Sequence, residues 1–357
     1  MLLRFFSRYL VPFQKAQLTF IIPCPGAPLR IPVHYSMGGL LIANTLLRTD
    51  GHSCSRSKVS QEMFCLQSSQ ALHVLENSLR RHLPESLKVY GTVYHMNHGN
   101  PFKLKALVDK WPDFNTLVIR PQEQDMTDDL DNYNNTYLIY SKDPKHCQEV
   151  LSASEVINWK QHLQIQSTQS SLGKVIESLG AMNLSEVKHT QCFLYMIFQT
   201  AKKLTPALVD EKNLVASSNK PKPFDRKLFK FASLDAAHAA LVDSSWSFGG
   251  NEKSRKFIER CILTLPSFCI MGPEGMPVSW ALVDHTGEMR MGGTSPEYRG
   301  QGLIYHLMCH QIQTLDNLGF PMYGHVAKAN FTMQRIAAMV KHIPMPCTWN
   351  QWNCVPL

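Results

Sequence analysis

Residues 287–304 constrain the fold of this chain more than any other stretch, because they join a strand pattern to a glycine-rich helix start. Residues 288–293 predict a strand, residues 294–298 a short connection that contains Pro296, and residues 302–315 a helix. A strand, a glycine turn and a helix N-terminus bring several backbone N–H groups to one point, which suits a phosphate or pyrophosphate. The sequence therefore predicts an anion site, with the carboxylate of Glu288 close to it.

The elements around this stretch predict a mixed sheet. Strands are expected at 268–271, 277–283 and 288–293, then a helix at 302–315, a strand at 322–326, a helix at 330–340 and a strand at 347–354. Short turns with glycine at 272–275 and 285–287 make the first strands a hairpin series. The order β-β-β-α-β-α-β belongs to the α/β (α+β) class.

The preceding part of the chain is also regular from Met63 onward. Its patterns predict helices at 69–83, 144–157 and 175–179, and strands at 87–96, 104–108, 116–119, 137–140 and 191–198. After position 225 they add a strand at 229–232 and helices at 234–242 and 251–263, the last with Asn251 as N-cap. The polar run at 213–225, with SSNKPKP inside it, is the best linker signal.

Length and composition exclude several classes of protein. A chain of 357 residues with 44% hydrophobic and 18% charged residues is long enough for two globular domains. The net charge of +8 is not gathered with aromatic residues into a patch, so we expect no nucleic acid partner. The ten cysteines are scattered without a C-x-x-C pair, which favours a reducing compartment and no bound metal.

Residues 1–62 differ from the rest. They hold seven Lys/Arg against Asp50 and Glu62, and their start, MLLRFFSRYLVPFQK, is basic and free of acid. This pattern fits a mitochondrial presequence, while a disordered tail or a misassigned upstream segment fits it equally well. No apolar run reaches the ~20 residues that span a bilayer, so we expect no membrane span.

The glycine-rich turn resembles the loop of the GCN5-related N-acyltransferases, whose pattern is Arg/Gln-x-x-Gly-x-Gly/Ala. Arg299 and Gly302 match it, whereas Ile304 departs from the small residue at the last position. The resemblance implies that backbone amides of the loop bind the pyrophosphate of coenzyme A, and that the preceding strand pairs with its pantetheine arm. The implied cofactor-binding residues are Met289, Met291, Arg299, Gly300, Gln301, Gly302, Leu303 and Asn330. A plain N-cap is the alternative role for Asn330.

A longer resemblance covers residues 63–357, which are similar throughout to the glycine N-acyltransferase family. The segments that carry it are PESLKVYG at 84–91, HGNPF at 98–102, DMTDD at 125–129, INWKQ at 157–161, FGGNE at 248–252, GPEG at 272–275 and WNQWN at 349–353. It implies two acyltransferase-like domains, at 63–212 and 226–357, joined by the linker 213–225, with 1–62 outside the match. Because members are mitochondrial, it also favours a mitochondrial matrix location.

The resemblance implies acyl transfer from an acyl-coenzyme A to the amino group of an amino acid, most often glycine, in conjugation and detoxification of acyl groups. Glutamine as acceptor, or a non-catalytic acyl-coenzyme A-binding paralogue, are the alternatives. We expect acyl-coenzyme A as co-substrate, no permanently bound cofactor and a monomer. An acceptor ammonium ion must lose a proton before it attacks.

Glu288 matches the catalytic glutamate that is proposed for the family. A dry cleft would raise its pKa toward neutrality and make it a general base, worth about 10²–10⁴-fold in rate. Amides near 289–291 are then expected to hold the oxyanion. Arg290 could bind the carboxylate of the acceptor or only pair with Glu288. His325 could protonate the leaving thiolate or be structural.

Overall fold

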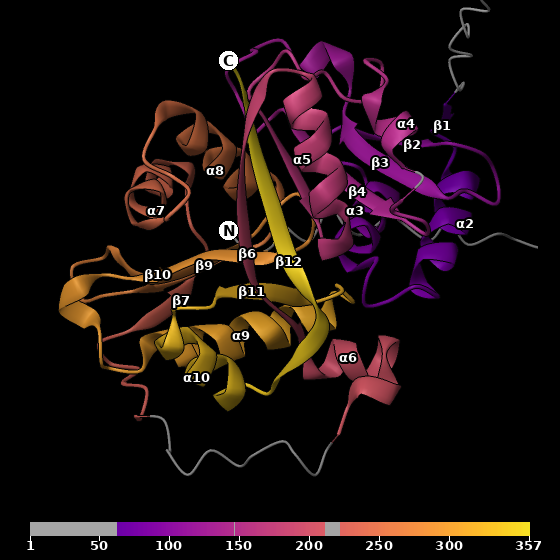
Figure 1. Cartoon of the computed structure of the whole chain (residues 1–357). Coiled ribbons are helices and arrows are strands. Elements are labelled where there is room, and N and C mark those ends of the chain that lie inside the picture. Colours follow the sequence, from indigo (N-terminus) through magenta and orange to yellow (C-terminus); the bar gives the residue numbers. More distant parts are fainter. Residues whose placement is uncertain (1–62, 146, 211–221) are drawn as a thin grey trace, which may run out of the picture. The chain divides into compact units, whose positions relative to one another are not determined.

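Two β-sheets organise the computed structural model, which describes residues 63–145, 147–210 and 222–357 (Figure 1). The large sheet has eight strands in the order β1-β2-β3-β4-β5-β12-β6-β11. They are β1 (Phe64–Leu66), β2 (Leu104–Val108), β3 (Thr116–Pro121), β4 (Thr136–Ser141), β5 (Leu163–Ser167), β6 (Ser185–Ile197), β11 (Tyr323–Ala327) and β12 (His342–Pro356). All neighbours are antiparallel except β4 and β5.

The small sheet has four antiparallel strands in the order β10-β9-β8-β7. They are β7 (Lys230–Ala232), β8 (Ser267–Met271), β9 (Pro277–Val283) and β10 (Met289–Thr294). Tight turns join β8 to β9 and β9 to β10, as the glycines at 275 and 287 predict. The predicted hairpin series is confirmed.

A backbone bridge joins the two sheets. Glu288, the residue before β10, forms an isolated parallel bridge with Tyr323, the first residue of β11. Beyond that bridge, and within the described ranges, β10 pairs only with β9, and β11 pairs only with β6. Each strand therefore keeps one edge free of strand partners among the described residues, and the two free edges start from the same point.

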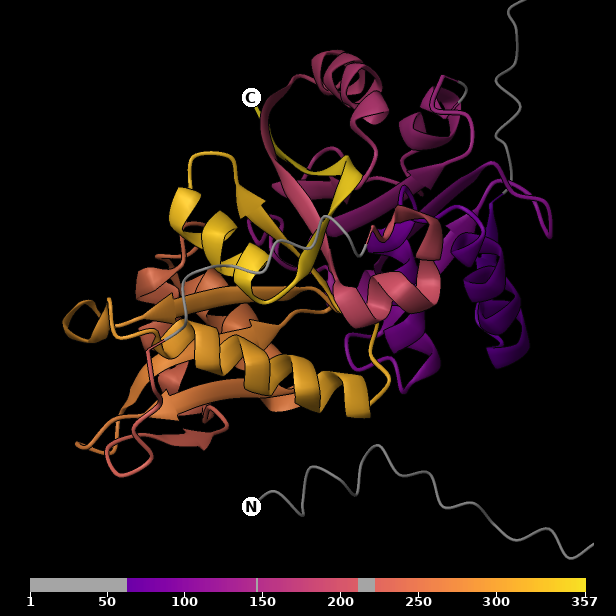
Figure 2. The same cartoon turned by 90° about the horizontal axis from the view of Figure 1, so that it is seen from below.

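Helices cover both faces of the small sheet. The helix α9 (Leu303–Asn317) crosses one face, and α7 (Ala239–Ser245) and α8 (Glu252–Thr264) lie on the other (Figures 1 and 2). The side chain of Asn251 caps α8 as predicted. The remaining α-helices are α2 (Ser69–Arg80), α3 (Leu87–Asn97), α4 (Gln148–Ser152), α5 (Gly173–Met182), α6 (Phe198–Leu204) and α10 (Phe331–Met339).

The prediction of a strand at 87–96 is wrong, because these residues form the helix α3. Their valines and tyrosines favour a strand by propensity, but the segment is buried on almost every side. Tertiary burial therefore overrides propensity, as it does for helices that are apolar all round. Gly91 shows how close the packing is, since a Cβ there would lie 2.6 Å from the carbonyl oxygen of Thr286.

Other differences are smaller. The helix predicted at 144–157 shrinks to α4, and the strand β5 was not predicted. The closing strand β12 begins at His342 and so extends further than residues 347–354. The predicted order β-β-β-α-β-α-β from β8 to β12 is confirmed, and with it the mixed α/β class.

The predicted domain organisation is only partly visible. Residues 1–62, with the predicted presequence, and residues 213–221 of the linker lie outside the described residues. The large sheet takes β1 to β6 from before the linker and β11 and β12 from after it. The division into domains at 63–212 and 226–357 stays a prediction. No helix in the described ranges has the length and apolar character that a bilayer span needs.

Candidate active site

The carboxylate of Glu288 lies at the point where the two sheets meet. It is 0% exposed and accepts hydrogen bonds from three side chains. Lys88 of α3 contacts Oε2 through its ammonium group, and the indole Nε1 of Trp349 donates to the same oxygen at 3.1 Å. His325 of β11 contacts Oε1 through Nδ1. The site thus combines residues from α3, β11 and β12 around the start of β10.

The electrostatics of Glu288 contradict the predicted rise of its pKa. Burial alone would raise the pKa of this carboxyl group, but Lys88 and His325 outweigh burial and lower the pKa to about 2. Lys88 is 1% exposed, so its charge is hardly screened by water. Glu288 is therefore an ionised carboxylate at neutral pH. Sequence reasoning missed Lys88, because it lies in the segment misread as a strand.

Arg290 pairs with Asp284 and not with Glu288. Its Nη1 donates to Asp284 Oδ2 at 3.1 Å, and both side chains are buried. The guanidinium lies 5.4 Å from the ring centres of Trp246 and Trp349 and 5.7 Å from Phe248. The alternative in which Arg290 only pairs with Glu288 is therefore wrong, and binding of the acceptor carboxylate stays a prediction.

Asp284 shapes the turn that carries Glu288, and sequence reasoning did not single it out. Its Oδ1 accepts from Thr286 N at 2.8 Å and from Glu288 N at 3.2 Å. Burial opposes ionisation, but Lys88, His285 and Arg290 together hold the pKa of Asp284 well below its usual range. The ionised side chain therefore fixes the backbone just before the sheet junction.

The free edge of β10 contains an irregularity. The register against β9 shifts between Arg290 and Gly293, and Met291 has φ of +54°. A non-glycine residue with positive φ is uncommon, and a bulge leaves ladder groups without strand partners. Met289 still pairs with Val283. Polar backbone groups near Met291 are thus available on this edge.

The predicted anion loop has the expected local geometry. Gly300 and Gly302 have φ of +74° and +80°, and Gly302 is the N-cap of α9. The backbone N–H groups of residues 300–304, which include Gln301 and Leu303, have no backbone acceptor among the described residues. Arg299 is anchored through Nε, which donates to the carbonyl of Thr294 at 3.1 Å. The loop therefore has several N–H donors that an anion could use.

The departure from the loop pattern at Ile304 is accommodated by a glycine on the neighbouring strand. Its Cδ1 lies 4.0 Å from the position that a Cβ on Gly292 would take. The helix α9 still contacts β8, β9 and β10. The larger side chain at Ile304 therefore leaves the helix start intact.

Lys222 is a residue at this loop that sequence reasoning missed. A Cβ on Gly302 would lie 3.7 Å from Lys222 Cβ, and a ring nitrogen of His306 contacts the Lys222 carbonyl at 2.7 Å. A lysine therefore stands beside the start of α9.

Asn330 acts as the N-cap of α10. Its Oδ1 accepts a hydrogen bond from Met333 N at 3.0 Å. The N-cap role, which was the alternative for Asn330, is thus present. A contact between Asn330 and the cofactor stays a prediction.

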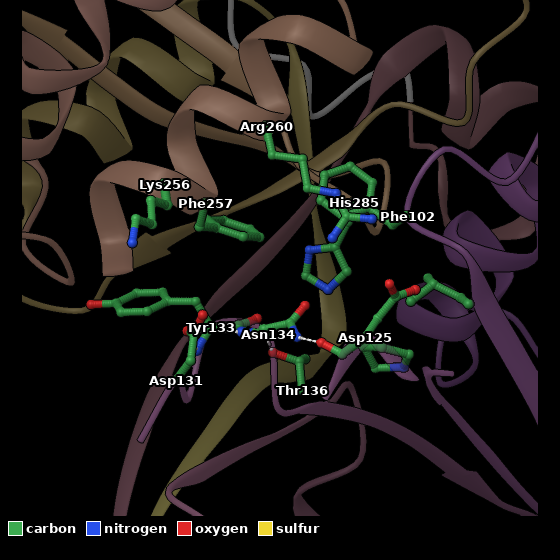
Figure 3. A pocket seen from close by; sticks show the side chains of 12 residues that line it. Phe102, Asp125, Asp131, Tyr133, Asn134, Thr136, Lys256, Phe257, Arg260 and His285 are labelled. Atoms are coloured by element: carbon green, nitrogen blue, oxygen red, sulfur yellow. Dashed lines mark hydrogen bonds between the residues drawn. The ribbon is translucent and has the colours of Figure 1, made fainter. Parts of the chain in front are cut away.

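A separate hollow lies between α8 and the segment before β4 (Figure 3). It has a volume of about 250 Å³. Arg260, Lys256 and Phe257 line it from α8, Asp131 and Tyr133 face them, and His285 projects between them (Figure 3). Glu288, Lys88, His325 and Trp349 are not part of its lining. The hollow is therefore distinct from the cluster around Glu288.

The cysteines of the described residues are free thiols. They are Cys65, Cys147, Cys192, Cys261, Cys269, Cys309, Cys347 and Cys354. Cys261 and Cys269 are buried in the core. In the described part of the chain no group of His, Cys, Asp or Glu side chains is arranged to hold a metal ion.

Comparison with known families explains this geometry. Residues 63–266 match the family described as aralkyl acyl-CoA:amino acid N-acyltransferase, and residues 268–356 match the C-terminal region of the same family. The chain belongs to this family. It is therefore an acyl-CoA-dependent amino acid N-acyltransferase, and acyl-CoA is its co-substrate. The boundary between the matched regions falls at the start of β8.

Relatives support the same assignment. The chain is 78% identical over 295 residues to mouse glycine N-acyltransferase-like protein Keg1. The aligned region covers 83% of this chain and 100% of the relative. It is 60% identical over 292 residues to rat glycine N-acyltransferase, covering 82% and 99%. It is 59% identical over 295 residues to bovine glycine N-phenylacetyltransferase, covering 83% and 100%.

A solved structure supports the fold alone. The crystal structure of a Drosophila protein superposes with a TM-score of 0.61 at 14% identity, covering 82% of this chain and 98% of that one. The mixed α/β arrangement therefore recurs at low sequence identity.

Proposed function

We propose that this enzyme transfers an acyl group from acyl-CoA to the amino group of glycine. The observation that carries the proposal is the junction of β10 and β11, where two free strand edges diverge from the buried Glu288. An extended pantetheine arm can pair with a free strand edge, as peptides do. Its thioester would then lie beside Glu288 and the irregular backbone at Met291.

The anion loop supports the position of the other end of the cofactor. Coenzyme A carries a pyrophosphate and a further phosphate, and unpaired N–H groups at a helix N-terminus bind such groups. Gly300 and Gly302 present these donors, and Lys222 stands beside them. Bound here, the pyrophosphate would face donors on α9 while the arm follows β10.

Backbone donors near Met291 are suited to the reaction itself. Attack of an amine on the thioester carbonyl creates an oxyanion, which N–H donors stabilise. The positive φ of Met291 turns backbone groups away from the ladder with β9. Donors at this position would contribute more to the transition state than to binding of the substrate.

Glycine as acceptor is favoured by the relatives. Proteins that are 60% and 59% identical to this chain are named for glycine as acceptor. Glutamine is the alternative acceptor. Glu288 contributes an ionised carboxylate to the proton transfer that the acceptor requires. Conjugation of acyl groups from acyl-CoA, and hence their detoxification, follows from this chemistry.

Release of free thiol from acyl-CoA tests the proposal. The full chain is incubated with benzoyl-CoA or phenylacetyl-CoA, and with glycine or glutamine at matched concentrations. We expect thiol release and N-acylglycine, with a higher kcat/KM for glycine than for glutamine. Faster turnover of glutamine would assign the other acceptor. Acyl-CoA binding without release for any amino acid would leave only a binding protein.

The mitochondrial location is proposed on the composition of residues 1–62, which is basic and poor in acid. Import of a fusion of residues 1–62 with a reporter into energised, isolated mitochondria tests it. Protection of the reporter from added protease is expected. A reporter that stays accessible under the same conditions contradicts the proposal.

A further inference from the structure

Glu288 cannot reach an acceptor directly in this arrangement. Its side chain is 0% exposed, and each carboxylate oxygen already contacts a donor. Lys88 and Trp349 occupy Oε2, and His325 occupies Oε1. Any proton that moves between the acceptor and this cluster must therefore pass through one of the groups around the carboxylate.

His325 is the member of the cluster that reaches the surface. Its side chain is 13% exposed, whereas that of Lys88 is 1% exposed and Trp349 is fully buried. The ring stacks on Trp349 with 4.0 Å between centres and 15° between planes. One face and one nitrogen of the imidazole are thus fixed, and the remaining edge lies toward the exterior.

The partners of His325 determine which nitrogen is free. An ionised carboxylate only accepts hydrogen bonds, so Nδ1 carries the hydrogen that is shared with Glu288. In the neutral ring the opposite nitrogen, Nε2, then has a lone pair. Nε2 has no hydrogen-bond partner in the described ranges of the chain, and it is not among the fully buried unpaired atoms.

We propose that His325 is the catalytic residue that accepts the proton of the acceptor amine, and that Glu288 is a positioning residue that acts through it. This inference rests on the proposed acyltransfer function and deepens it. Glu288 holds the imidazole in the tautomer that leaves Nε2 free, and it stabilises the imidazolium that forms. Lys88 in turn keeps Glu288 ionised.

Every proton in the reaction has a donor and an acceptor when His325 takes this role. Nε2 takes one proton from the acceptor ammonium, and the amine lone pair then forms a C–N bond with the thioester carbon. The C–S bond breaks, and the second nitrogen-bound proton that must leave goes to the departing thiolate, which becomes the free thiol. The imidazolium releases the first proton to water at its exposed edge, which restores the neutral ring.

The charges around His325 suit an uncharged ring. The charged groups that act on it are Glu288 and Arg290 at β10 and Lys88 on α3. Burial lowers the pKa of His325 below its ordinary 6.5, Glu288 opposes that shift, and the cations add to it. A neutral imidazole at neutral pH is ready to accept a proton.

His325→Asn is the sharpest test, because the Asn amide can keep the hydrogen bond to Glu288 but has no basic nitrogen. We expect kcat to fall by about 10²–10⁴-fold with little change in KM for acyl-CoA. We also expect the residual rate to rise with pH as the free amine form of glycine increases. A purely structural histidine would not produce that recovery.

The matched control is His189→Asn. His189 stacks on Trp352 with 4.7 Å between centres and contacts Asn350, but it lies away from Glu288 on β6. We expect its kcat to equal that of the wild type. Thermal unfolding and acyl-CoA binding of each variant show whether it is folded, and His325→Gln serves as a second variant with the same expected loss.

The outcomes are distinguishable. If the wild type turns over and folded His325→Asn keeps its kcat and its pH profile, His325 is not the proton acceptor. If Glu288→Gln abolishes turnover while His325→Asn does not, Glu288 acts without His325. A wild type without turnover for any amino acid overturns the proposed function, and the inference with it.

Discussion

Lys88 on α3 and Glu288 at the start of β10 form a buried ion pair between residues that are 200 positions apart in the sequence. This pair connects the part of the fold before the linker with the strand that carries the site. Neither side chain reaches water, and Lys88 is the main cation that holds the pKa of Glu288 low against burial. The pair therefore links folding stability to the ionisation of Glu288.

Removal of Lys88 is expected to be costly. Lys88→Met leaves the Glu288 carboxylate buried opposite an uncharged side chain, so we expect the free energy of unfolding to fall by about 3–5 kcal/mol. Lys88→Met combined with Glu288→Gln is expected to recover most of that loss, since no unpaired charge remains. Urea unfolding at neutral pH measures both.

The control for this prediction is a pair near the surface. Lys105 pairs with Glu123, whose side chain is 65% exposed. Lys105→Met is expected to change the free energy of unfolding by less than about 1 kcal/mol. Equal losses for Lys88→Met and Lys105→Met would contradict the special role of burial.

Gly302 is expected to matter for both folding and cofactor binding. Its φ of +80° is unfavourable for a side chain, so Gly302→Ala should cost about 1–2 kcal/mol of stability and raise KM for acyl-CoA. Gly275 is the matched control, since it has φ of +75° and a Cβ there would meet no atom within 4 Å. Gly275→Ala should cost similar stability and leave KM unchanged.

Lys222 should contribute to affinity for the phosphates. Lys222→Ala is expected to raise KM for acyl-CoA by up to about tenfold, which corresponds to about 1.4 kcal/mol, without a comparable change in kcat. The effect should shrink at high ionic strength because salt screens an exposed charge. Lys230→Ala, on the exposed strand β7, is the control. Steady-state kinetics at low and high salt give the answer.

Two buried histidines should make stability fall in mild acid. Burial is the main cause that lowers the pKa of His95 and of His285 to about 4 in the folded protein, from an ordinary 6.5. Between pH 4 and pH 6.5 the unfolded chain binds more protons than the folded protein, so the free energy of unfolding rises with pH. From pH 7 to pH 5 we expect a loss of about 1–2 kcal/mol per histidine in urea unfolding.

Variants separate the contribution of His95 to the pH dependence of stability from the contributions of other titrating groups. His95→Gln should flatten the dependence of the free energy of unfolding on pH. Glu288 affects stability in a more acidic pH range than the histidines, because its pKa in the folded protein is lowered to about 2. Its share of the stability is complete above the ordinary pKa of 4.5 and is lost only as pH falls toward about 2. An unchanged slope in His95→Gln would contradict the assignment.

Much of the C-terminal part of the fold was predictable from local pattern. Strand alternation and glycine turns predicted β8 to β10, and the glycine start predicted α9, because each depends on residues close in sequence. The segment at 87–96 was not predictable in this way. Its valines and tyrosines favour a strand, and only its burial against the rest of the fold makes it a helix.

The sequence by itself determined the glycine-rich loop, the carboxylate at Glu288 and the family of the chain. Only the tertiary structure decided what surrounds that carboxylate. Lys88 and His325 approach Glu288 because α3 and β11 pack at the junction of the sheets, and no local pattern records such a contact. The charge of Lys88 and the hydrogen bond from His325 lower the pKa of Glu288, which burial alone would have raised.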